Sequence, residues 1–330
     1  MKYLIAGLGS IGRRHFRNLL ALGEKDIILY RTHHSTLPDH ELEGFPEETD
    51  LHAALSQHPN AVIISNPTAF HMDTAIAAAR AGCHLLIEKP ISDSLEHIDN
   101  LRAAVHQGGI EVLVGFQFRF HPTLQIAAGL IGEGAIGRPL YICAHWGEYL
   151  PDWHPWENYK HSYAACADLG GGVLLTMCHP LDYVRYLFGE IQSHSVMMDT
   201  IGDLGIGVED IAVISLRFAN GAIGSIHLDY LQQPPMHRVE MIGSEGSLLW
   251  DNEDGRLRLY RAQLKRWETW MPPEGFERNW MFLEEMRHFM TVVRRESQPL
   301  CSLDDGIRVM EIAHAAKAAA MEREGGKCLI

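Results

Sequence analysis

The 330-residue chain has no apolar stretch that approaches the length needed to cross a membrane, so we expect no membrane partner. Its first residues, MKYLIAGLGS, run from a short apolar segment straight into glycines. They lack the longer apolar core of a secretory signal, and we expect a cytoplasmic protein. Basic charge is also scarce, because 28 Lys and Arg stand against 42 Asp and Glu, a net charge of −14. This balance argues against nucleic acid as a partner, although a few local cations could still bind a small anion.

Paired cysteines are absent as well. None of the six cysteines forms a C-x-x-C pair, and a chain of this length needs no disulfides for stability. We therefore expect free thiols in a reducing compartment. The sequence contains no internal repeats and no low-complexity segments, and its length exceeds what one compact core usually supports. Two globular domains are the expected organisation.

The first glycines of the chain have the spacing of a dinucleotide-binding loop. An apolar strand over Tyr3–Ala6 precedes Gly7, Gly9 and Gly12, and a helical apolar pattern follows up to Gly23. In such a loop the first glycine allows a tight turn, the second lets the backbone approach a pyrophosphate, and the third lets the helix pack on the strand. The helix N-terminus attracts the anion. The context predicts that the chain binds a nicotinamide dinucleotide.

The residue after the second predicted strand, within 26–30, should meet the adenosine ribose of that cofactor. NAD-binding sites usually place an acidic residue there, which binds the ribose 2′-hydroxyl. This chain has Arg31 followed by Thr32. An arginine suits the 2′-phosphate of NADP, so the sequence favours NADP over NAD. The alternative is that Arg31 stacks on the adenine, which is compatible with either cofactor.

Strands and helices alternate through the first third of the chain, with further strands predicted within 60–67, 84–90 and 110–122. This alternation predicts an α/β fold with a parallel, doubly wound sheet that binds its ligand at the carboxyl ends of the strands. Ser92 or Asp93 is the expected N-cap of the helix after the strand within 84–90. Seven residues lie at or just past strand ends: Asn66, Pro67, His71, Glu88, Lys89, Pro90 and Gln117.

The second half of the chain predicts more antiparallel structure. Alternating apolar residues indicate a strand within 137–150, a β-hairpin around residues 219–221, and two more strands around 243–246. Two long helical patterns close the chain.

A polar, aromatic-rich loop over 151–169 precedes a glycine triplet and is typical of a substrate lid. Trp153, Lys160 and Tyr163 are its predicted substrate contacts, because aromatic faces stack on sugars and lysine donates hydrogen bonds. Each tryptophan could equally hold the loop on its own domain.

After the triplet, apolar residues recur at helical spacing, with Thr176 and His179 on a second face. Pro180 removes a helical partner from the carbonyl of Thr176, so we expect the helix to kink or to begin late there. Cys178 beside His179 lacks the second ligand pair that a zinc site needs, and no metal site is predicted.

Taken together, these motifs resemble the Gfo/Idh/MocA family of NAD(P)-dependent sugar oxidoreductases. The resemblance spans nearly the whole chain and rests on the glycine loop, NPTAFH (66–71), EKP (88–90), GGGVLLTMCHPLDY (170–183), MIGSEGSLLWD (241–251) and a C-terminal helix from about Trp280. It implies an N-terminal Rossmann domain over 1–120 and a C-terminal α+β domain over 121–330. The second domain would carry a large, mostly antiparallel open sheet that binds substrate and forms a homodimer or homotetramer.

The resemblance also implies roles for single residues. Lys89 would be the catalytic lysine, and His179 would match the catalytic histidine. Both are expected to contact the substrate, as is Thr176. With Arg31 and Thr32 added, the expected cofactor contacts are Gly7, Gly9, Ser10, Ile11, Gly12, Arg31, Thr32, Asn66, His71, Glu88, Lys89 and Gln117. Family members with a proton-relaying dyad often carry an Asp three or four residues before the histidine, where this chain has Leu175 and Thr176.

The predicted reaction is hydride transfer between a nicotinamide and a hydroxyl or keto carbon of a sugar or sugar derivative, which could be N-acylated or nucleotide-linked. Lys89 would take or give the hydroxyl proton as the hydride moves, and His179 would share it. One alternative is an NAD(P)-binding sensor or regulator without turnover, because Thr176 occupies the expected Asp position. Another is a lyase or glycosidase that uses transient oxidation through the same cofactor.

Overall fold

The computed structural model of the chain describes residues 1–33 and 37–325 and divides into two compact units. The first unit combines Met1–Gln117 with Glu277–Met310, and the second combines Phe118–Phe276 with Glu311–Ile330. From the sequence we expected all of 121–330 to form one domain. The difference arises because the buried side of α8 (Arg278–Val293), which includes Phe282 and Phe289, packs with α1 (Ser10–Ala21) and β6 (Val112–Gly115) of the first unit.

The first unit is built on a six-stranded, wholly parallel sheet in the order β3-β2-β1-β4-β5-β6. The other strands are β1 (Tyr3–Ala6), β2 (Ile27–Tyr30), β3 (Glu47–Glu48), β4 (Ala61–Ile64) and β5 (His84–Glu88). Every side chain of the central strands β1 and β4 is buried, as expected of strands with helices on both faces. Every side chain of the edge strand β6 is buried as well. The doubly wound parallel sheet predicted from the alternation is thereby confirmed.

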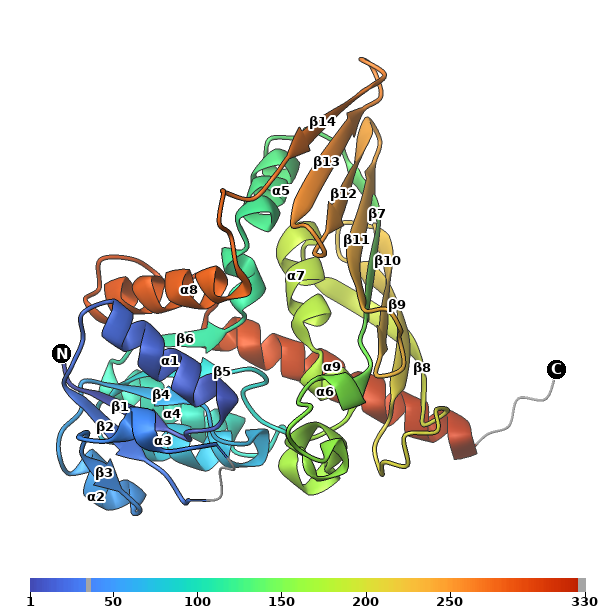
Figure 1. The fold of residues 1–330 in the computed structure, drawn as a ribbon. Helices are drawn as coiled ribbons and strands as arrows, with labels where there is room; N and C mark the ends of the chain where they lie inside the picture. Colours follow the sequence, from blue (N-terminus) through green and yellow to red (C-terminus); the bar gives the residue numbers. More distant parts are fainter. Residues whose placement is uncertain (34–36, 326–330) are drawn as a thin grey trace. The chain divides into compact units, whose positions relative to one another are not determined.

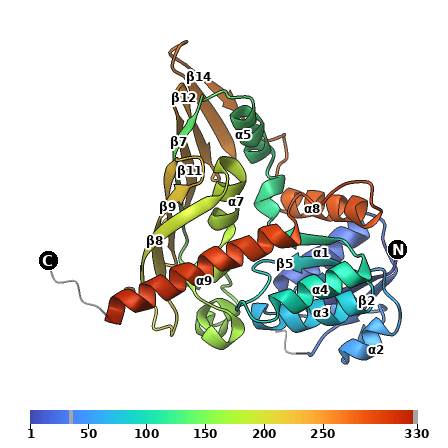
Figure 2. The same cartoon turned by 180° about the vertical axis from the view of Figure 1, so that it is seen from behind.

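Helices cover both faces of this sheet. α1 and α8 lie on one face, and α3 (His71–Arg80) and α4 (Ile98–Gly108) lie on the other (Figures 1 and 2), with α2 (Leu51–Leu55) beside β2 and β3. The predicted start of α4 was wrong, because its N-cap is His97 rather than Ser92 or Asp93. The Ser92 hydroxyl instead accepts a hydrogen bond from the backbone N–H of Ser94 at 3.2 Å, so it stabilises a local turn.

The second unit contains an eight-stranded sheet in the order β14-β13-β12-β11-β7-β10-β9-β8. Its pairs are antiparallel except for the parallel pair of β7 and β10, which confirms the expected mostly antiparallel sheet. The strands are β7 (Pro139–Gly147), β8 (Ile191–Asp199), β9 (Ile211–Phe218), β10 (Ile223–Asp229), β11 (Met236–Gly243), β12 (Gly246–Asp251), β13 (Arg256–Arg261) and β14 (Arg266–Trp270). The predicted hairpin is β9–β10, whereas β8 was not predicted.

One face of the second sheet is covered by α5 (Pro122–Gly132), α6 (Val173–Thr176) and α7 (His179–Phe188), of which α5 and α7 can be followed in Figure 1. Strand residues on this face, such as Trp146 and Leu228, are buried. Their neighbours along the strands point to the opposite face, where Arg217, Arg238 and Glu240 are exposed. We call this opposite side the open face of the sheet.

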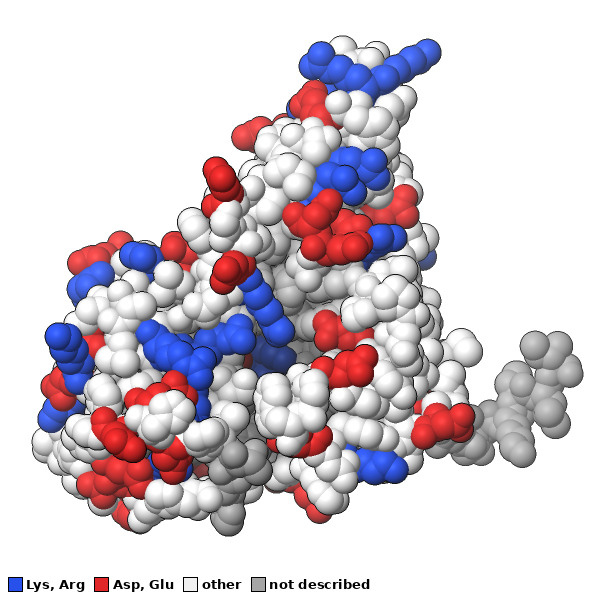
Figure 3. Space-filling view, viewed as in Figure 1, with Lys and Arg blue, Asp and Glu red and all other residues white. Residues whose placement is uncertain are grey.

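Some sequence expectations concern the whole chain. The last helix, α9 (Leu303–Gly325), contributes to both units. None of the described helices is long and apolar enough to span a bilayer. Five cysteines are free thiols, as predicted, and Cys328 lies outside the described residues. Figure 3 shows acidic and basic side chains interspersed over one face.

Candidate functional site

The glycine loop after β1 shows why each of its three glycines is needed. Gly7 has a φ of +97°, and a Cβ there would collide with the backbone of Asn66. A Cβ at Gly12 would collide with the Gly7 carbonyl oxygen and lie 2.7 Å from the Ser65 hydroxyl oxygen. A Cβ at Gly9 would meet nothing within 4 Å. The fold itself therefore requires Gly7 and Gly12, whereas Gly9 borders open space where a pyrophosphate would fit.

The N-terminus of α1 faces the same loop. Gly9 is its N-cap, so no side chain caps the helix, and its first turn holds no acidic residue. The free N–H groups and the positive end of the helix dipole suit a bound anion. Ser10 is exposed and Ile11 is half-buried at this end of the helix. Arg13 is buried, and its Nε donates to the Leu8 carbonyl at 3.0 Å, so it stabilises the loop.

Arg31, at the end of β2, already has acidic partners. Its Nη2 lies 2.9 Å from both carboxylate oxygens of Asp39, and its Nη1 lies 3.4 Å from Oε2 of Glu47. Asp39 also accepts from Arg13 at 2.9 Å, and hydrogen bonds from Arg31 and then Arg13 lower the pKa of Asp39. Arg31 is buried, whereas Thr32 beside it is exposed. The positive charge of Arg31, which favoured NADP in the sequence, is therefore partly neutralised by Asp39 and Glu47.

Three predicted site residues follow adjacent strands of the parallel sheet. Asn66 comes after β4, Lys89 after β5 and Gln117 after β6, so they lie along the edge that carries the glycine loop of β1. The side-chain oxygens of Asn66 and Gln117 are buried and have no hydrogen-bond partner among the described residues. Buried acceptors are normally satisfied. These two oxygens suit the donors of a bound dinucleotide, such as its carboxamide or ribose hydroxyls.

His71 connects two of these turns. It is buried, with Nδ1 2.8 Å from the Pro90 carbonyl oxygen and Nε2 2.7 Å from the Asn66 carbonyl oxygen. Burial lowers the pKa of His71, although these backbone contacts oppose the shift. The side chain therefore holds the turn after β4 against the turn after β5. Its expected contact with the cofactor stays a prediction.

Glu88 belongs to a buried cluster that the sequence did not reveal. Its Oε1 lies 2.7 Å from Nε2 of His15, and Glu285 of α8 offers a third group, with the three nearest ligand atoms within 4.8 Å of one another. Burial alone would raise the pKa of Glu88, but the hydrogen bond and charge of His15, together with the charge and backbone N–H of Lys89, outweigh burial and lower the pKa. Burial and then the charge of Glu88 raise the pKa of Glu285, whose side chain is 0 % exposed. Burial and the charge of Glu88 therefore favour the neutral form of Glu285.

Lys89 is half-buried at the end of β5, and its backbone N–H donates to Oε2 of Glu88 at 3.2 Å. Glu88 is thus held by His15 and by the backbone N–H of Lys89. The Glu-Lys-Pro segment places a fixed carboxylate and a lysine at the edge where the cofactor loop lies.

In the second unit, the helix break expected at Pro180 is present. α6 ends at Thr176, and α7 begins at His179 with Pro180 in its first turn. His179 is 2 % exposed and packs with its ring centroid 5.0 Å from Phe118 and 5.6 Å from Trp146. The break therefore places His179 at the start of a helix, within an aromatic cluster.

That cluster, and the ion pair beside it, were missed from the sequence. Phe118 contacts the rings of Trp146, His179, Tyr183, His237 and Trp250. Arg119 forms a buried ion pair with Asp182 on α7, with Nη2 2.6 Å from Oδ1 and Nε 2.9 Å from Oδ2. The only signal in the sequence was the run of aromatic residues in FQFRFHP.

Thr176 is buried, and its side chain lies near the Tyr230 hydroxyl, where it opposes the rise that burial causes in the pKa of Tyr230. Its predicted substrate contact stays a prediction.

The aromatic loop over 151–169 folds into short 3-10 turns. Trp153 meets the ring of Tyr230 edge-on at 5.4 Å, and Tyr163 is 36 % exposed. Both line a small pocket with Leu150, His154, Glu157, Tyr159, Ser162 and Ala164. Lys160 is exposed, with its Nζ 5.9 Å above the ring of Tyr159. The structure thus brings Trp153 and Tyr163 to one pocket and leaves Lys160 on the surface nearby.

Comparison with known proteins identifies the family to which the chain belongs. Residues 1–116 match the model of an oxidoreductase family with an NAD-binding Rossmann fold, and residues 124–249 match the GFO/IDH/MocA C-terminal domain. The chain belongs to the Gfo/Idh/MocA family. Membership makes it an oxidoreductase with a nicotinamide-binding domain, as predicted, and does not separate NAD from NADP.

Gfo/Idh/MocA relatives match over nearly their full length. The myo-inositol 2-dehydrogenase of Thermotoga maritima is 28% identical over 346 residues, covering 99% of this chain and 98% of the relative. The scyllo-inositol 2-dehydrogenase (NAD(+)) of Bacillus subtilis is 29% identical, covering 94% and 92%. The solved structure of a levoglucosan dehydrogenase in complex with NADH has a TM-score of 0.87 at 23% identity, covering 98% and 97%. This last likeness confirms the fold class.

Proposed function

We propose that this Gfo/Idh/MocA protein is a dehydrogenase that moves a hydride between a nicotinamide and a hydroxyl-bearing or keto carbon of a sugar or cyclic polyol. The observation that carries the proposal is the meeting of the glycine loop, Asn66, Lys89 and Gln117 along one edge of the parallel sheet. Relatives named for inositols support a ring that carries several hydroxyl groups.

The residues present fit a nicotinamide dinucleotide. Gly9 leaves space for the pyrophosphate, and the uncapped start of α1 directs N–H groups toward it. The unpartnered oxygens of Asn66 and Gln117 accept hydrogen bonds from the cofactor. When bound, the nicotinamide accepts or supplies the hydride.

We propose that Lys89 transfers the proton. Its Nζ takes the proton of the reacting hydroxyl during oxidation and returns it during reduction. Glu88 fixes the backbone at this position, because its carboxylate is held by His15 and accepts from the Lys89 N–H. In the second unit, His179 is proposed to hydrogen-bond the reacting oxygen or share its proton, with its ring held by Phe118 and Trp146.

For the rest of the substrate, we propose contacts from Tyr163, Trp153 and Lys160. Tyr163 and Trp153 line one pocket and offer aromatic faces to the C–H surface of a sugar ring. Lys160 offers three donors to hydroxyl groups from the surface beside it. We propose a substrate contact for Thr176 as well, whose side chain lies near the Tyr230 hydroxyl.

At the adenosine end, we propose that Asp39 makes the site prefer NAD. The sequence favoured NADP because Arg31 replaces the usual acidic residue. In the structure, Arg31 and Arg13 hold Asp39, which is half-exposed and so able to accept from a ribose 2′-hydroxyl. To reach Arg31, the 2′-phosphate of NADP would have to displace Asp39, and the negative charge of Asp39 would repel it.

We propose a homodimer or homotetramer formed through the open face of the second sheet. Exposed apolar side chains on it, Val213 and Met197, occupy paired positions of β9 and β8. Size-exclusion chromatography with light scattering measures the assembly, and a monomer at micromolar concentration would refute it.

The activity is tested by incubating the purified chain with NAD or NADP and a panel of inositols, anhydrosugars, N-acylated sugars and nucleotide sugars, while following reduced-nicotinamide absorbance. We expect reduction of NAD with at least one cyclic polyol, and loss of turnover with retained cofactor affinity in Lys89→Met. Wild-type turnover in Lys89→Met would overturn the role of Lys89.

The same assay separates the alternatives. Tight cofactor binding without any absorbance change over the panel would indicate a sensor or regulator. Product formation without net change in the nicotinamide would indicate a lyase or glycosidase that oxidises its substrate transiently.

A further inference from the structure

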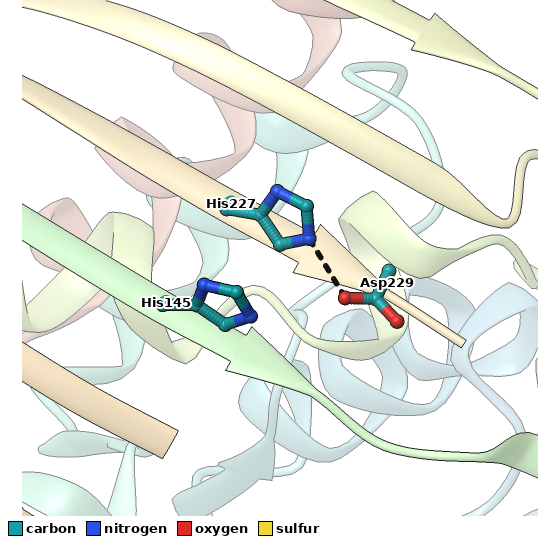
Figure 4. Close-up of side chains that lie close together, drawn as sticks. All are labelled: His145, His227 and Asp229. Carbon is teal, nitrogen blue, oxygen red and sulfur yellow. Dashed lines mark hydrogen bonds and ion pairs between the residues drawn. The ribbon is translucent and has the colours of Figure 1, made fainter. Parts of the chain in front are cut away.

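Three potential metal ligands converge on the open face of the second sheet. His145 lies on β7, and His227 and Asp229 lie on β10, two residues apart on the same side of the strand. His145 and His227 are direct partners in the parallel pair of β7 and β10. One ligand atom from each of the three residues lies within 4.8 Å of the others. Figure 4 shows the three side chains lying close together.

The three side chains of the cluster lie in direct contact range of one another. The two imidazole rings are stacked with centroids 4.3 Å apart and planes inclined by 26°. Nε2 of His227 lies 2.7 Å from Oδ2 of Asp229. Two imidazoles and one carboxylate thus present donors to the same small volume.

Asp229 is oriented by its surroundings. Its Oδ1 accepts the backbone N–H groups of Leu231 at 2.8 Å and Gln232 at 2.6 Å, which leaves Oδ2 directed to the histidines. Gly147 is the β7 partner of Asp229, and a Cβ at Gly147 would collide with Oδ2. Backbone donors that hold a carboxylate in place are typical of the outer shell of metal sites.

One ring nitrogen of His145 is only partly satisfied by the chain. Its Nε2 is buried and forms no hydrogen bond of normal geometry with the described residues, although the side chain of Gln232 is a neighbouring hydrogen-bonding group. Buried polar atoms normally have a well-placed partner. A metal ion would supply one.

We propose that His145, His227 and Asp229 bind a divalent transition-metal ion, with zinc as the preferred ion. Imidazole nitrogens and a carboxylate oxygen are ligands that zinc binds at about 2.0–2.2 Å. Small side-chain rotations bring the three donors to that distance from one ion. The side chain of His227 is 30% exposed, which gives access and leaves a fourth position for water or an outside donor.

Neighbouring charge does not oppose the ion strongly. Arg238, the β11 partner of His145, is the adjacent cation on this face. Its Nε donates to Oδ2 of Asp251 at 2.7 Å, so its charge is compensated. The site is also separate from that of His179, because α7 and Trp146 lie on the covered face of the sheet.

The test uses the full chain, stripped with a chelator and titrated with zinc chloride by calorimetry, with cobalt absorption as a second measurement. We expect one zinc ion per chain and a rise in the thermal midpoint on adding zinc. Affinity should fall at least tenfold in His145→Ala, His227→Ala and Asp229→Asn. His194→Ala, which changes another histidine of the same sheet on β8, is the matched control and should bind as wild type.

Either of two results would overturn the proposal: no stoichiometric zinc binding by the wild type, or equal affinity in wild type and the three variants. The melting curve of each metal-free variant shows whether it is folded, and His145→Gln replaces His145→Ala if that variant is not. Asp229→Asn keeps an oxygen for the N–H groups of Leu231 and Gln232, so its loss of affinity reports on the metal ligand rather than on the turn.

Discussion

Substitution by alanine should affect different properties at Gly9 and Gly12, although both lie in the same loop. In Gly12→Ala the new Cβ meets the Gly7 carbonyl oxygen and the Ser65 hydroxyl, so α1 must move away from β1. In Gly9→Ala the new Cβ meets nothing within 4 Å, and a φ of −74° is accessible to alanine. We therefore expect Gly12→Ala to weaken folding and Gly9→Ala to weaken cofactor binding alone.

The size of each effect follows from opposing contributions. For Gly12→Ala, overpacking costs about 1–3 kcal/mol, and the backbone carbonyl cannot rotate away, which favours the upper half of that range. The better helix propensity of alanine returns about 0.8–1 kcal/mol. The net loss of about 1–2 kcal/mol lowers the thermal midpoint by about 2–8 °C for a unit of this size.

For Gly9→Ala the folding contributions nearly cancel. Alanine is a poorer N-cap than glycine by up to about 1 kcal/mol. It also reduces the entropy of the unfolded chain, which returns about 0.4–1 kcal/mol. A methyl group beside the pyrophosphate should weaken NAD binding at least tenfold, or about 1.4 kcal/mol.

Thermal melts without cofactor and calorimetric titration with NAD measure the two effects separately. Gly129→Ala is the matched control, because Gly129 is an exposed helical position with nothing within 4 Å of its new Cβ. It should melt at or slightly above the wild type and bind NAD equally. The reasoning fails if Gly12→Ala melts like the wild type, or if Gly9→Ala binds NAD with unchanged affinity.

Three further predictions concern buried charge and the adenosine end. Glu285 has a raised pKa when folded, so its contribution to stability is complete below its usual value of 4.5 and is lost as the pH rises towards the folded pKa. As the pH rises through that window, the free energy of unfolding of Glu285→Gln should therefore increase relative to that of the wild type, by at most about 1.4 kcal/mol per pH unit. Urea unfolding at several pH values measures this difference, and a difference that does not change with pH would contradict the prediction. Asp182→Ala leaves Arg119 buried without its carboxylate and should cost about 3–5 kcal/mol in the same assay, and a loss below about 1 kcal/mol would show that the ion pair is unimportant. Asp39→Asn should raise the ratio of NADP to NAD turnover at least tenfold by freeing Arg31, and an unchanged ratio would refute the proposed role of Asp39.

Local patterns predicted the elements that local chemistry determines. The glycine loop, the hairpin of β9 and β10 and the helix break at Pro180 each depend on residues close in sequence, and all three were predicted. The α4 start was wrong, because Ser92 can cap a turn as well as a helix.

What the sequence could not show are pairings between distant residues. Glu285 is almost two hundred residues from Glu88, and Asp39 looks like any other loop carboxylate until Arg31 is seen to hold it. His145 and His227 become neighbours only through a parallel strand pair within an otherwise antiparallel sheet.

The return of Glu277–Met310 to the first unit has a consequence for how the chain is made. Residues 1–117 leave the ribosome without α8, so the surface later covered by Phe282 and Phe289 is exposed while about 175 further residues, up to the end of α8, are synthesised. At about 5–20 residues per second, that interval is about 9–35 seconds. Completion of the nucleotide-binding unit thus follows synthesis of the whole second sheet, and a fragment cut at residue 117 would lack part of its own core.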